Sequence, residues 1–198
     1  MSLSAFNAAW GDSPDLAPLF VVVGGAAGTG KSTVAGELSA QIPGLTVVST
    51  ALIRTVLRAT RSNGLWLDAH TYDLPSVEAF VEQSRPIMAA INELARFARS
   101  ERQLFAVEGS SLVPGLFSEP VGVTAIELYL AVSDPDQHRM MLGGPTHARK
   151  LSERQFGRCR VLQDFIIAEA AQQSRIVVEF DAGLDVALAL VEDRLRTT

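Results

Sequence analysis

The most constraining feature of this sequence is a glycine-rich stretch, GGAAGTGKST, that occupies Gly24–Thr33. From Gly25 to Ser32 it matches the pattern G-x-x-x-x-G-K-[ST] without a mismatch. An apolar run, Leu19–Val23, precedes it, and apolar residues at helical spacing follow it. A strand, a glycine-rich turn and a helix in this order predict a loop that binds phosphate groups.

The residue types in this loop suit a nucleoside triphosphate. Glycines allow backbone N–H groups to converge on phosphate oxygens, and the positive end of the following helix points to the same place. Lys31 is expected to reach the β- and γ-phosphates, and the Ser32 hydroxyl to bind Mg²⁺. A guanine-reading Asn-Lys-x-Asp motif is absent, because neither Lys31 nor Lys150 follows an asparagine, so a GTPase is excluded.

Two further groups of residues suit phosphoryl transfer. Glu108 ends the apolar stretch LFAVEG, where a neighbouring strand would bring a carboxylate close to the metal. Arginines stabilise the charge that develops on the transferred phosphoryl group. Five of them lie in or beside one predicted loop: Arg139, Arg149, Arg154, Arg158 and Arg160.

Composition limits the class of protein. The chain has 198 residues, a formal net charge of -5 and a sequence pI of about 5.2. Nucleic-acid binding is not expected, because such proteins usually carry a basic excess. No apolar run approaches the length of a membrane helix, so a cytoplasmic protein without a membrane partner is predicted. The oligomeric state cannot be predicted from these features.

The alternation of strands and helices predicts an α/β fold with a doubly wound parallel sheet. We expect a P-loop NTPase fold: a five-stranded, mainly parallel sheet with helices on both faces and a small helical lid. The expected strands are 19–23, 45–48, 103–107, 124–132 and 175–180, and the expected helices are 29–41, 51–59, 76–100, a helix starting at 134, 151–173 and 184–196.

The domain organisation is expected to be simple. Residues 1–18 are predicted to be an N-terminal tail, and residues 19–198 a single P-loop kinase domain. Within this domain, residues 134–158 are predicted to act as the lid, since Gly143 and Gly144 lie between two helices and can absorb backbone rotation. Pro86 lies inside a long helical stretch and is expected to kink or split it.

Three stretches of the sequence resemble the P-loop small-molecule kinases, and most closely the 2-phosphoglycerate kinase family. The first is GGAAGTGKSTVAGELS followed by VVSTALIRTVLRA, and the second is FAVEGSSLVPG. The third, SDPDQHRMM with RCRVLQDFIIAEA, is similar to the family's His-Arg lid segment and the helix after it. Together they cover most of residues 19–180, and the Glu-Gly-x-x-Leu-Val-Pro-Gly match is the specific one.

The resemblance implies roles for individual residues. It implies that Arg54 contacts the substrate, and that Glu108 serves the metal or the substrate. We expect the acceptor to bind between Arg54, Glu108 and the turn formed by Ser110 and Ser111. Lys31 and Glu108 would act in catalysis together with Arg139 and Arg158, which would close on the phosphates. ATP would be bound by Gly25, Ala26, Ala27, Gly28, Thr29, Gly30, Lys31, Ser32 and Thr33.

The sequence departs from the family at two positions of the acceptor half. Ala51 stands where the family has an aspartate, and Ser111 stands where it has a histidine. Asp68, Asp73 or Glu108 could supply the missing carboxylate. The sequence predicts an ATP-dependent kinase that phosphorylates a small anionic or hydroxylated metabolite. The alternative is a nucleotide-binding regulatory protein with a degenerate acceptor site.

Overall fold

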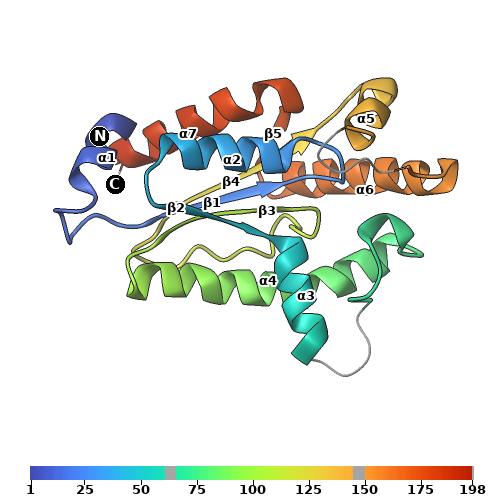
Figure 1. Cartoon of the computed structure of the whole chain (residues 1–198), viewed down its shortest axis with the longest axis horizontal. Coiled ribbons are helices and arrows are strands. Elements are labelled where there is room, and N and C mark those ends of the chain that lie inside the picture. The colour runs from blue at the N-terminus through green and yellow to red at the C-terminus, as the bar shows by residue number, and fades with distance from the viewer. Residues whose placement is uncertain (61–65, 145–149, 198) are drawn as a thin grey trace.

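The structure is a computed structural model, and it describes residues 1–60, 66–144 and 150–197. Five parallel strands form one sheet in the order β2-β3-β1-β4-β5. β1, which precedes the glycine-rich loop, is therefore central (Figure 1). The predicted fold class, a P-loop NTPase fold with a parallel sheet covered by helices on both faces, is confirmed.

The elements follow the expected order along the chain. The strands are β1 (Leu19–Gly24), β2 (Leu45–Ser49), β3 (Leu104–Gly109), β4 (Thr124–Ala131) and β5 (Ile176–Glu179). The α-helices are α1 (Leu3–Ala9), α2 (Lys31–Gln41), α3 (Thr50–Thr60), α4 (Val77–Ser100), α5 (Pro135–Leu142), α6 (Glu153–Gln172) and α7 (Gly183–Thr197). Short 3-10 turns occur at η1 (Thr71–Asp73) and η2 (Phe180–Ala182).

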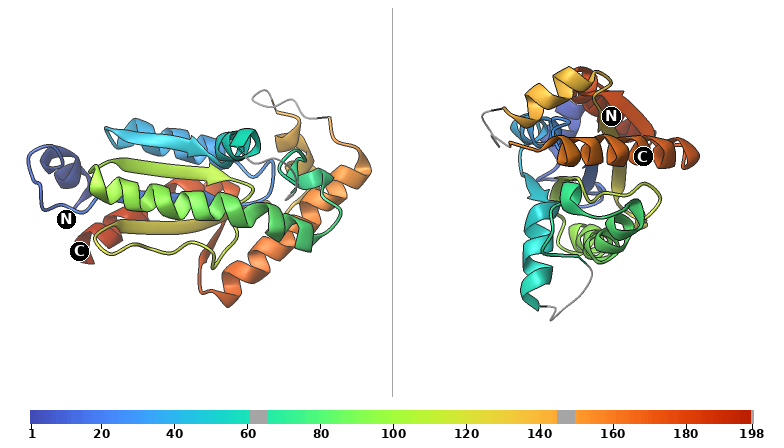
Figure 2. Two further views of the ribbon diagram at one scale, coloured as in Figure 1. Left: turned by 90° about the horizontal axis from the view of Figure 1, so that it is seen from below. Right: turned by 90° about the vertical axis from the view of Figure 1, so that its right-hand side faces the viewer.

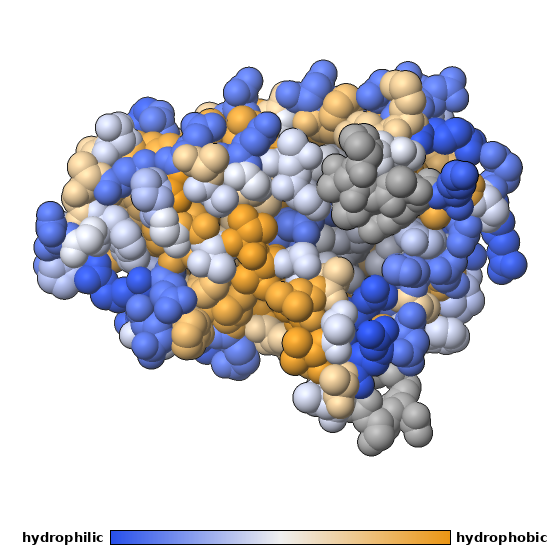
Figure 3. All heavy atoms as spheres, in the orientation of Figure 1, coloured by the Kyte–Doolittle hydropathy of each residue, from blue (hydrophilic) through white to orange (hydrophobic). Residues whose placement is uncertain are grey.

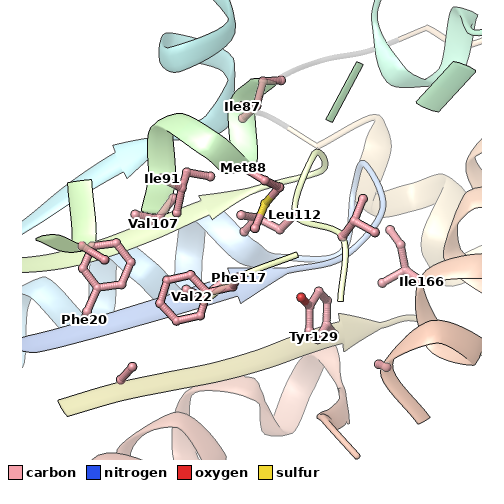
Figure 4. Close-up of a cluster of buried hydrophobic side chains, with 14 of the residues drawn as sticks. Phe20, Val22, Ile87, Met88, Ile91, Val107, Leu112, Phe117, Tyr129 and Ile166 are labelled. Atoms are coloured by element: carbon pink, nitrogen blue, oxygen red, sulfur yellow. The ribbon is translucent and has the colours of Figure 1, made fainter. Parts of the chain in front are cut away.

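The sheet separates two apolar cores. On one face, α2 and α7 cover the central strands, and α1 packs beside the end of α7; on the other face α4 runs along the sheet (Figures 1 and 2). Figure 4 shows how α4 packs: Ile87, Met88 and Ile91 face Val22 of β1 and Val107 of β3. Because β1, β3 and nearly all of β4 are buried on both faces, their sequences are continuous apolar runs rather than alternating ones.

The parallel register brings three chain segments to one edge of the sheet. Gly24 at the end of β1 is paired with Gly109 of β3, and Glu108 is paired with Ser49 at the end of β2. The carboxyl ends of the strands in an open α/β sheet are where ligands bind. The glycine-rich loop, Glu108 and the start of α3 therefore meet at the same edge.

Three local features differ from the sequence-based expectations. The predicted tail contains α1, because Ser2 caps this helix and Phe6 is fully buried against the core shared with α7. α4 continues unbroken through Pro86, so the proline does not split the helix. α2 begins at Lys31 rather than Thr29, since Gly30 has a left-handed backbone, with φ of 82°.

Figure 3 shows an apolar patch on the face that carries β2 and α3. Val47 of β2 and Leu52 and Val56 of α3 are exposed there.

In the described part of the chain, no helix is both long and apolar enough to span a bilayer.

Candidate active site

The glycine-rich loop passes very close to the neighbouring strand. Gly25 has φ of 140°, and a Cβ atom at this position would lie 2.5 Å from the carbonyl oxygen of Leu130 in β4. Any other residue would therefore clash with the backbone and strain its own conformation. The first glycine of the motif is required by the packing of the loop against the sheet.

The Lys31 side chain is folded back onto this loop. It is only 6% exposed, and its Nζ donates to the Ala26 carbonyl at 2.6 Å and to Thr29 Oγ1 at 3.3 Å. Thr29 Oγ1 also donates to the Ala26 carbonyl, at 3.1 Å. The ammonium group is thus held at the centre of the loop, where the loop's own carbonyl and hydroxyl oxygens partly replace its hydration.

Ser32 and Glu108 lie next to the lysine. The Ser32 hydroxyl donates to Glu108 Oε2 at 3.0 Å, and Glu108 is 8% exposed although it ends a strand. The described residues contain no cluster of three or more His, Cys, Asp or Glu side chains that could hold a metal alone. A hydroxyl and one carboxylate suit Mg²⁺, which keeps several waters and binds substrate phosphates. Ser32 and Glu108 therefore fit such an ion.

A cavity of about 450 Å³ opens beside these residues. It joins the glycine-rich loop to the start of α3, to the segment after β3 and to the 3-10 turn η1. The described residues that line it are Ala27, Gly28, Gly30, Lys31, Ser32, Thr33, Ser49, Thr50, Ala51, Arg54, His70, Thr71, Tyr72, Glu108, Gly109, Ser110, Ser111, Met141 and Gly144. The structure thus brings together the predicted nucleotide-binding, metal-binding and substrate-binding residues.

Arg54, on α3, lines the cavity and also donates to the carbonyl of Ala69. The same carbonyl accepts from Gln83 Nε2 of α4 at 2.9 Å, so two donors fix this segment. Ser110 and Ser111, which follow Glu108 in sequence, also line the cavity.

Nothing in the sequence pattern singles out His70 and Tyr72 as site residues. The structure puts His70 in the cavity wall, stacked on Tyr72 with ring centroids 5.1 Å apart. The contacts of Ala69 with α3 and α4 bring this segment to the cavity, and such long-range contacts leave no local sequence signal. An imidazole and a phenol thus line the wall near Arg54.

The three candidate replacements for a carboxylate at Ala51 lie in different places. Glu108 lines the cavity, as does Ala51 itself. Asp68 is exposed and pairs with Arg58 at 3.7 Å, and Asp73 accepts from Gln155 Nε2 at 2.8 Å. Among the described lining residues, Glu108 is the one carboxylate.

The two arginines predicted to close on the phosphates contact other partners. Arg139 pairs with Glu153 through both guanidinium nitrogens, at 2.8 and 3.0 Å, and lies over the Phe156 ring. Arg158 donates to the carbonyl of Pro75 at 2.6 Å. Neither side chain lines the cavity, and their role at the phosphates stays a prediction. Arg149 lies outside the described residues.

A buried histidine supports the loop from behind. His138 of α5 is fully buried, and its Nε2 lies 2.7 Å from the Ala27 carbonyl oxygen. Burial lowers the pKa of this imidazole, and the positive charges of Arg160 and Lys31 lower it further, although the hydrogen bond to Ala27 acts in the opposite direction. The spacing of residues in α5 contains nothing that singles out this contact.

The sheet order and the loop at its edge define the fold of the P-loop kinases. The shikimate kinase of Acinetobacter baumannii superposes with a TM-score of 0.54 at 16% identity, covering 99% of this chain and 98% of that one. A gluconokinase of Sinorhizobium meliloti gives a TM-score of 0.55 at 14% identity, covering 92% and 97%.

In sequence, the chain is similar to archaeal 2-phosphoglycerate kinases. The protein of this name from Methanopyrus kandleri is 24% identical over an aligned length of 202 residues, and the alignment covers 90% of this chain and 62% of that protein. The mevalonate-3-phosphate 5-kinase of Thermoplasma acidophilum is 27% identical over 130 residues, covering 61% and 64%. The chain thus spans less than two thirds of the length of these relatives. No protein-family model matches it.

Proposed function

We propose that this chain is an ATP-dependent kinase that transfers the γ-phosphoryl group to a hydroxyl of a small anionic or hydroxylated metabolite, as a 2-phosphoglycerate kinase-like enzyme. The observation that carries the proposal is the pairing of Ser32 with Glu108 in a cavity that Arg54 also lines. A nucleotide site and an anion-binding arginine thus share one cavity. The relatives in sequence are named as kinases, which supports the same activity.

In this proposal each residue has a defined task. Backbone N–H groups of residues 25–33 bind the phosphates, and Lys31 moves its ammonium from the Ala26 carbonyl to the β- and γ-phosphates. Ser32 and Glu108 hold Mg²⁺, which neutralises phosphate charge when bound. Arg54 orients an anionic group of the acceptor by charge-assisted hydrogen bonds. Catalysis then rests on positioning and charge stabilisation, which dominate phosphoryl transfer.

The acceptor is tested by a coupled ADP-release screen over phosphoglycerates, hydroxy acids, sugars and aminoglycosides. Ser111 in place of a histidine removes a possible cation, so an acceptor with less negative charge than a phosphoglycerate is expected to react best. A large preference for phosphoglycerates would contradict the expectation that Ser111 favours an acceptor with less negative charge. Phosphorylation of any one class over a no-acceptor control would support the kinase proposal.

The second candidate is a nucleotide-binding regulatory protein. The observation in its favour is Ala51, which lines the cavity at the position where a carboxylate would orient the attacking hydroxyl. Loss of that base need not end transfer, because phosphoryl transfer depends little on proton removal. Tight ATP binding with no product from any acceptor in the screen would favour the regulatory function.

Replacing Arg54 by alanine should affect the acceptor rather than ATP. We expect the acceptor KM to rise or kcat to fall by about tenfold, the cost of one charge-assisted hydrogen bond, with little change in ATP affinity. Arg58→Ala is the matched control, since Arg58 also joins α3 to the following segment, through Asp68, but does not line the cavity. Equal losses for both ligands, or equal effects of both variants, would contradict this role.

We further propose that the single kinase domain of residues 19–198 carries a lid at residues 134–158. Of this segment, 145–149 lie outside the described residues. The Arg139–Glu153 pair that joins α5 to α6 is exposed, and such pairs contribute little stability, so it can open. Hydrogen exchange should slow at Gly143, Gly144 and residues 150–158 when an ATP analogue binds. Protection confined to residues 25–33 would contradict a lid.

A further inference from the structure

We propose that His138 is a positioning residue: as a neutral imidazole with its proton on Nε2, it holds the Ala27 carbonyl and thereby sets the phosphate-binding conformation of the loop. This inference rests on the proposed binding of ATP by the loop. It assigns a function to a buried side chain that touches neither the cavity nor the predicted metal site. Three observations support it: the distances around the imidazole ring, the packing of α5 against the loop, and the charges that surround the ring.

The two ring nitrogens of His138 face opposite requirements. The Ala27 carbonyl oxygen, 2.7 Å from Nε2, can only accept, so Nε2 must carry a proton. Arg160 Nη1, 3.4 Å from Nδ1, can only donate, so Nδ1 must present its lone pair. The neutral Nε2–H tautomer is the form that satisfies both neighbours. Phe156 packs edge-on against the ring, with centroids 5.7 Å apart, and limits its rotation.

The carbonyl held by His138 lies where the loop reverses direction. A loop that points its N–H groups at an anion must turn its carbonyl oxygens away from it. The Ala27 carbonyl does so, because the His138 side chain that binds it is buried and does not line the cavity. The Ala26 carbonyl accepts instead from Lys31 and Thr29 within the loop. The next residue, Gly28, is left-handed, with φ of 82°.

Packing fixes α5 against the same point of the loop. A Cβ atom at Gly28 would lie 2.5 Å from the Leu142 side chain and 3.3 Å from the His138 ring. Ala27, Leu142, Phe156 and Cys159 form a small separate apolar cluster around this contact. The hydrogen bond from His138 is therefore shielded from water, where such bonds are strongest.

Arg160 connects this support to the sheet. Its guanidinium donates to the carbonyls of Val132 and Ser133, at 2.5 and 3.1 Å, directly after β4. The loop is thus joined through His138 on α5 and Arg160 on α6 to the strand that neighbours β1. A protonated imidazole would face two cations, Arg160 from α6 and Lys31 from α2.

The test compares three variants that separate the donor from the ring. His138→Gln keeps an N–H donor the same number of bonds from Cα as Nε2, and His138→Phe keeps a ring without a donor. His138→Asn has a donor that is one bond too short, and it replaces the Phe variant if that variant does not fold. Binding of the non-hydrolysable analogue AMP-PNP with Mg²⁺ is measured by calorimetry.

We expect His138→Phe to bind the analogue about tenfold more weakly, as for the loss of one buried hydrogen bond, and His138→Gln to stay near wild type. Equal affinity of the Phe variant and wild type would overturn the proposal. If the Gln variant is as weak as the Phe variant, the ring acts by packing and not by donation.

A second measurement needs no nucleotide. Hydrogen exchange of the amides in residues 26–30 of the ligand-free protein should be faster in His138→Phe than in wild type, and near wild type in His138→Gln. If no protein in the series binds AMP-PNP, the proposed function fails, and exchange alone then decides the role of His138. Equal exchange in wild type and the Phe variant would overturn it.

The pH dependence gives a third readout. Because burial lowers the pKa of His138 from its ordinary value of 6.5, the imidazole is mostly neutral at pH 6.5 and gains its proton as the pH falls further. Protonation would place a charge against Arg160 and weaken the contact, so the benefit is present above that range and lost below it. The readout is the ratio of the AMP-PNP affinity of wild type to that of His138→Gln, because titration of the analogue itself affects both proteins equally. This ratio should fall as the pH is lowered. A constant ratio would argue against the neutral tautomer.

Discussion

Lys31→Ala should reduce turnover by at least about 100- to 1,000-fold, the range found when one preorganised charge donor is removed from a reacting centre. The lysine is buried within the glycine-rich loop, and no other lysine lies in the cavity wall formed by described residues. Removing it leaves the proposed β- and γ-phosphate charges without their main cation. ATP affinity by calorimetry and ADP release with the best acceptor measure the effect.

The control must remove one positive charge without touching the site. Lys150, the second lysine of the chain, lies in the proposed lid and is unsuitable. Arg196→Ala is better matched, because Arg196 is an exposed residue of α7 that pairs only loosely with Glu192, at 3.3 Å. If Lys31→Ala binds ATP and turns it over as wild type does, the glycine-rich loop is not the nucleotide site.

Glu108→Gln is the second variant with a large expected effect. The amide can still accept the hydrogen bond from Ser32, but it has no charge to offer Mg²⁺. We expect the Mg²⁺ concentration needed for half-maximal turnover to rise by about 10- to 100-fold, the usual cost of weakening a metal site. Mg²⁺ titrations at saturating ATP provide the measurement.

Glu127→Gln controls for the loss of a buried carboxylate elsewhere in the sheet. Glu127 lies on β4, where it pairs with Arg175 at 2.9 Å and accepts from the Tyr129 hydroxyl, and burial raises its pKa. This variant should lower thermal stability but leave the Mg²⁺ dependence unchanged. A Mg²⁺ requirement that is the same in Glu108→Gln and wild type would remove Glu108 from the metal site.

Much of the nucleotide half was predictable because its signals are local. The strand, the glycines and the helix around Lys31 are contiguous in sequence, and the apolar run before Glu108 predicted a buried strand that ends beside them. Parallel pairing then places the strand ends together without further information. The helix boundaries were predicted less well, as α2 shows: its start depends on the left-handed conformation of Gly30.

The acceptor half and the support of the loop were less predictable because they depend on distant contacts. The segment of His70 is held by contacts of Ala69 with Arg54 and Gln83 and of Asp73 with Gln155, all distant in sequence. His138 meets Ala27 across 111 residues of sequence. The helix α1 was missed since its stability comes from burying Phe6 against the core that α7 shares, which a short local pattern does not reveal.

The two halves of the cavity are built on different parts of the fold. The phosphate side is built by β1, β3 and α2 at the centre of the sheet, whereas the proposed acceptor side adds α3 and the turn η1, which lie outside the sheet, to the residues that follow β3. Mutations in the outer part can therefore accumulate without unfolding the centre. Descendants of one ancestral gene could keep the same phosphate donor while diverging in what they phosphorylate.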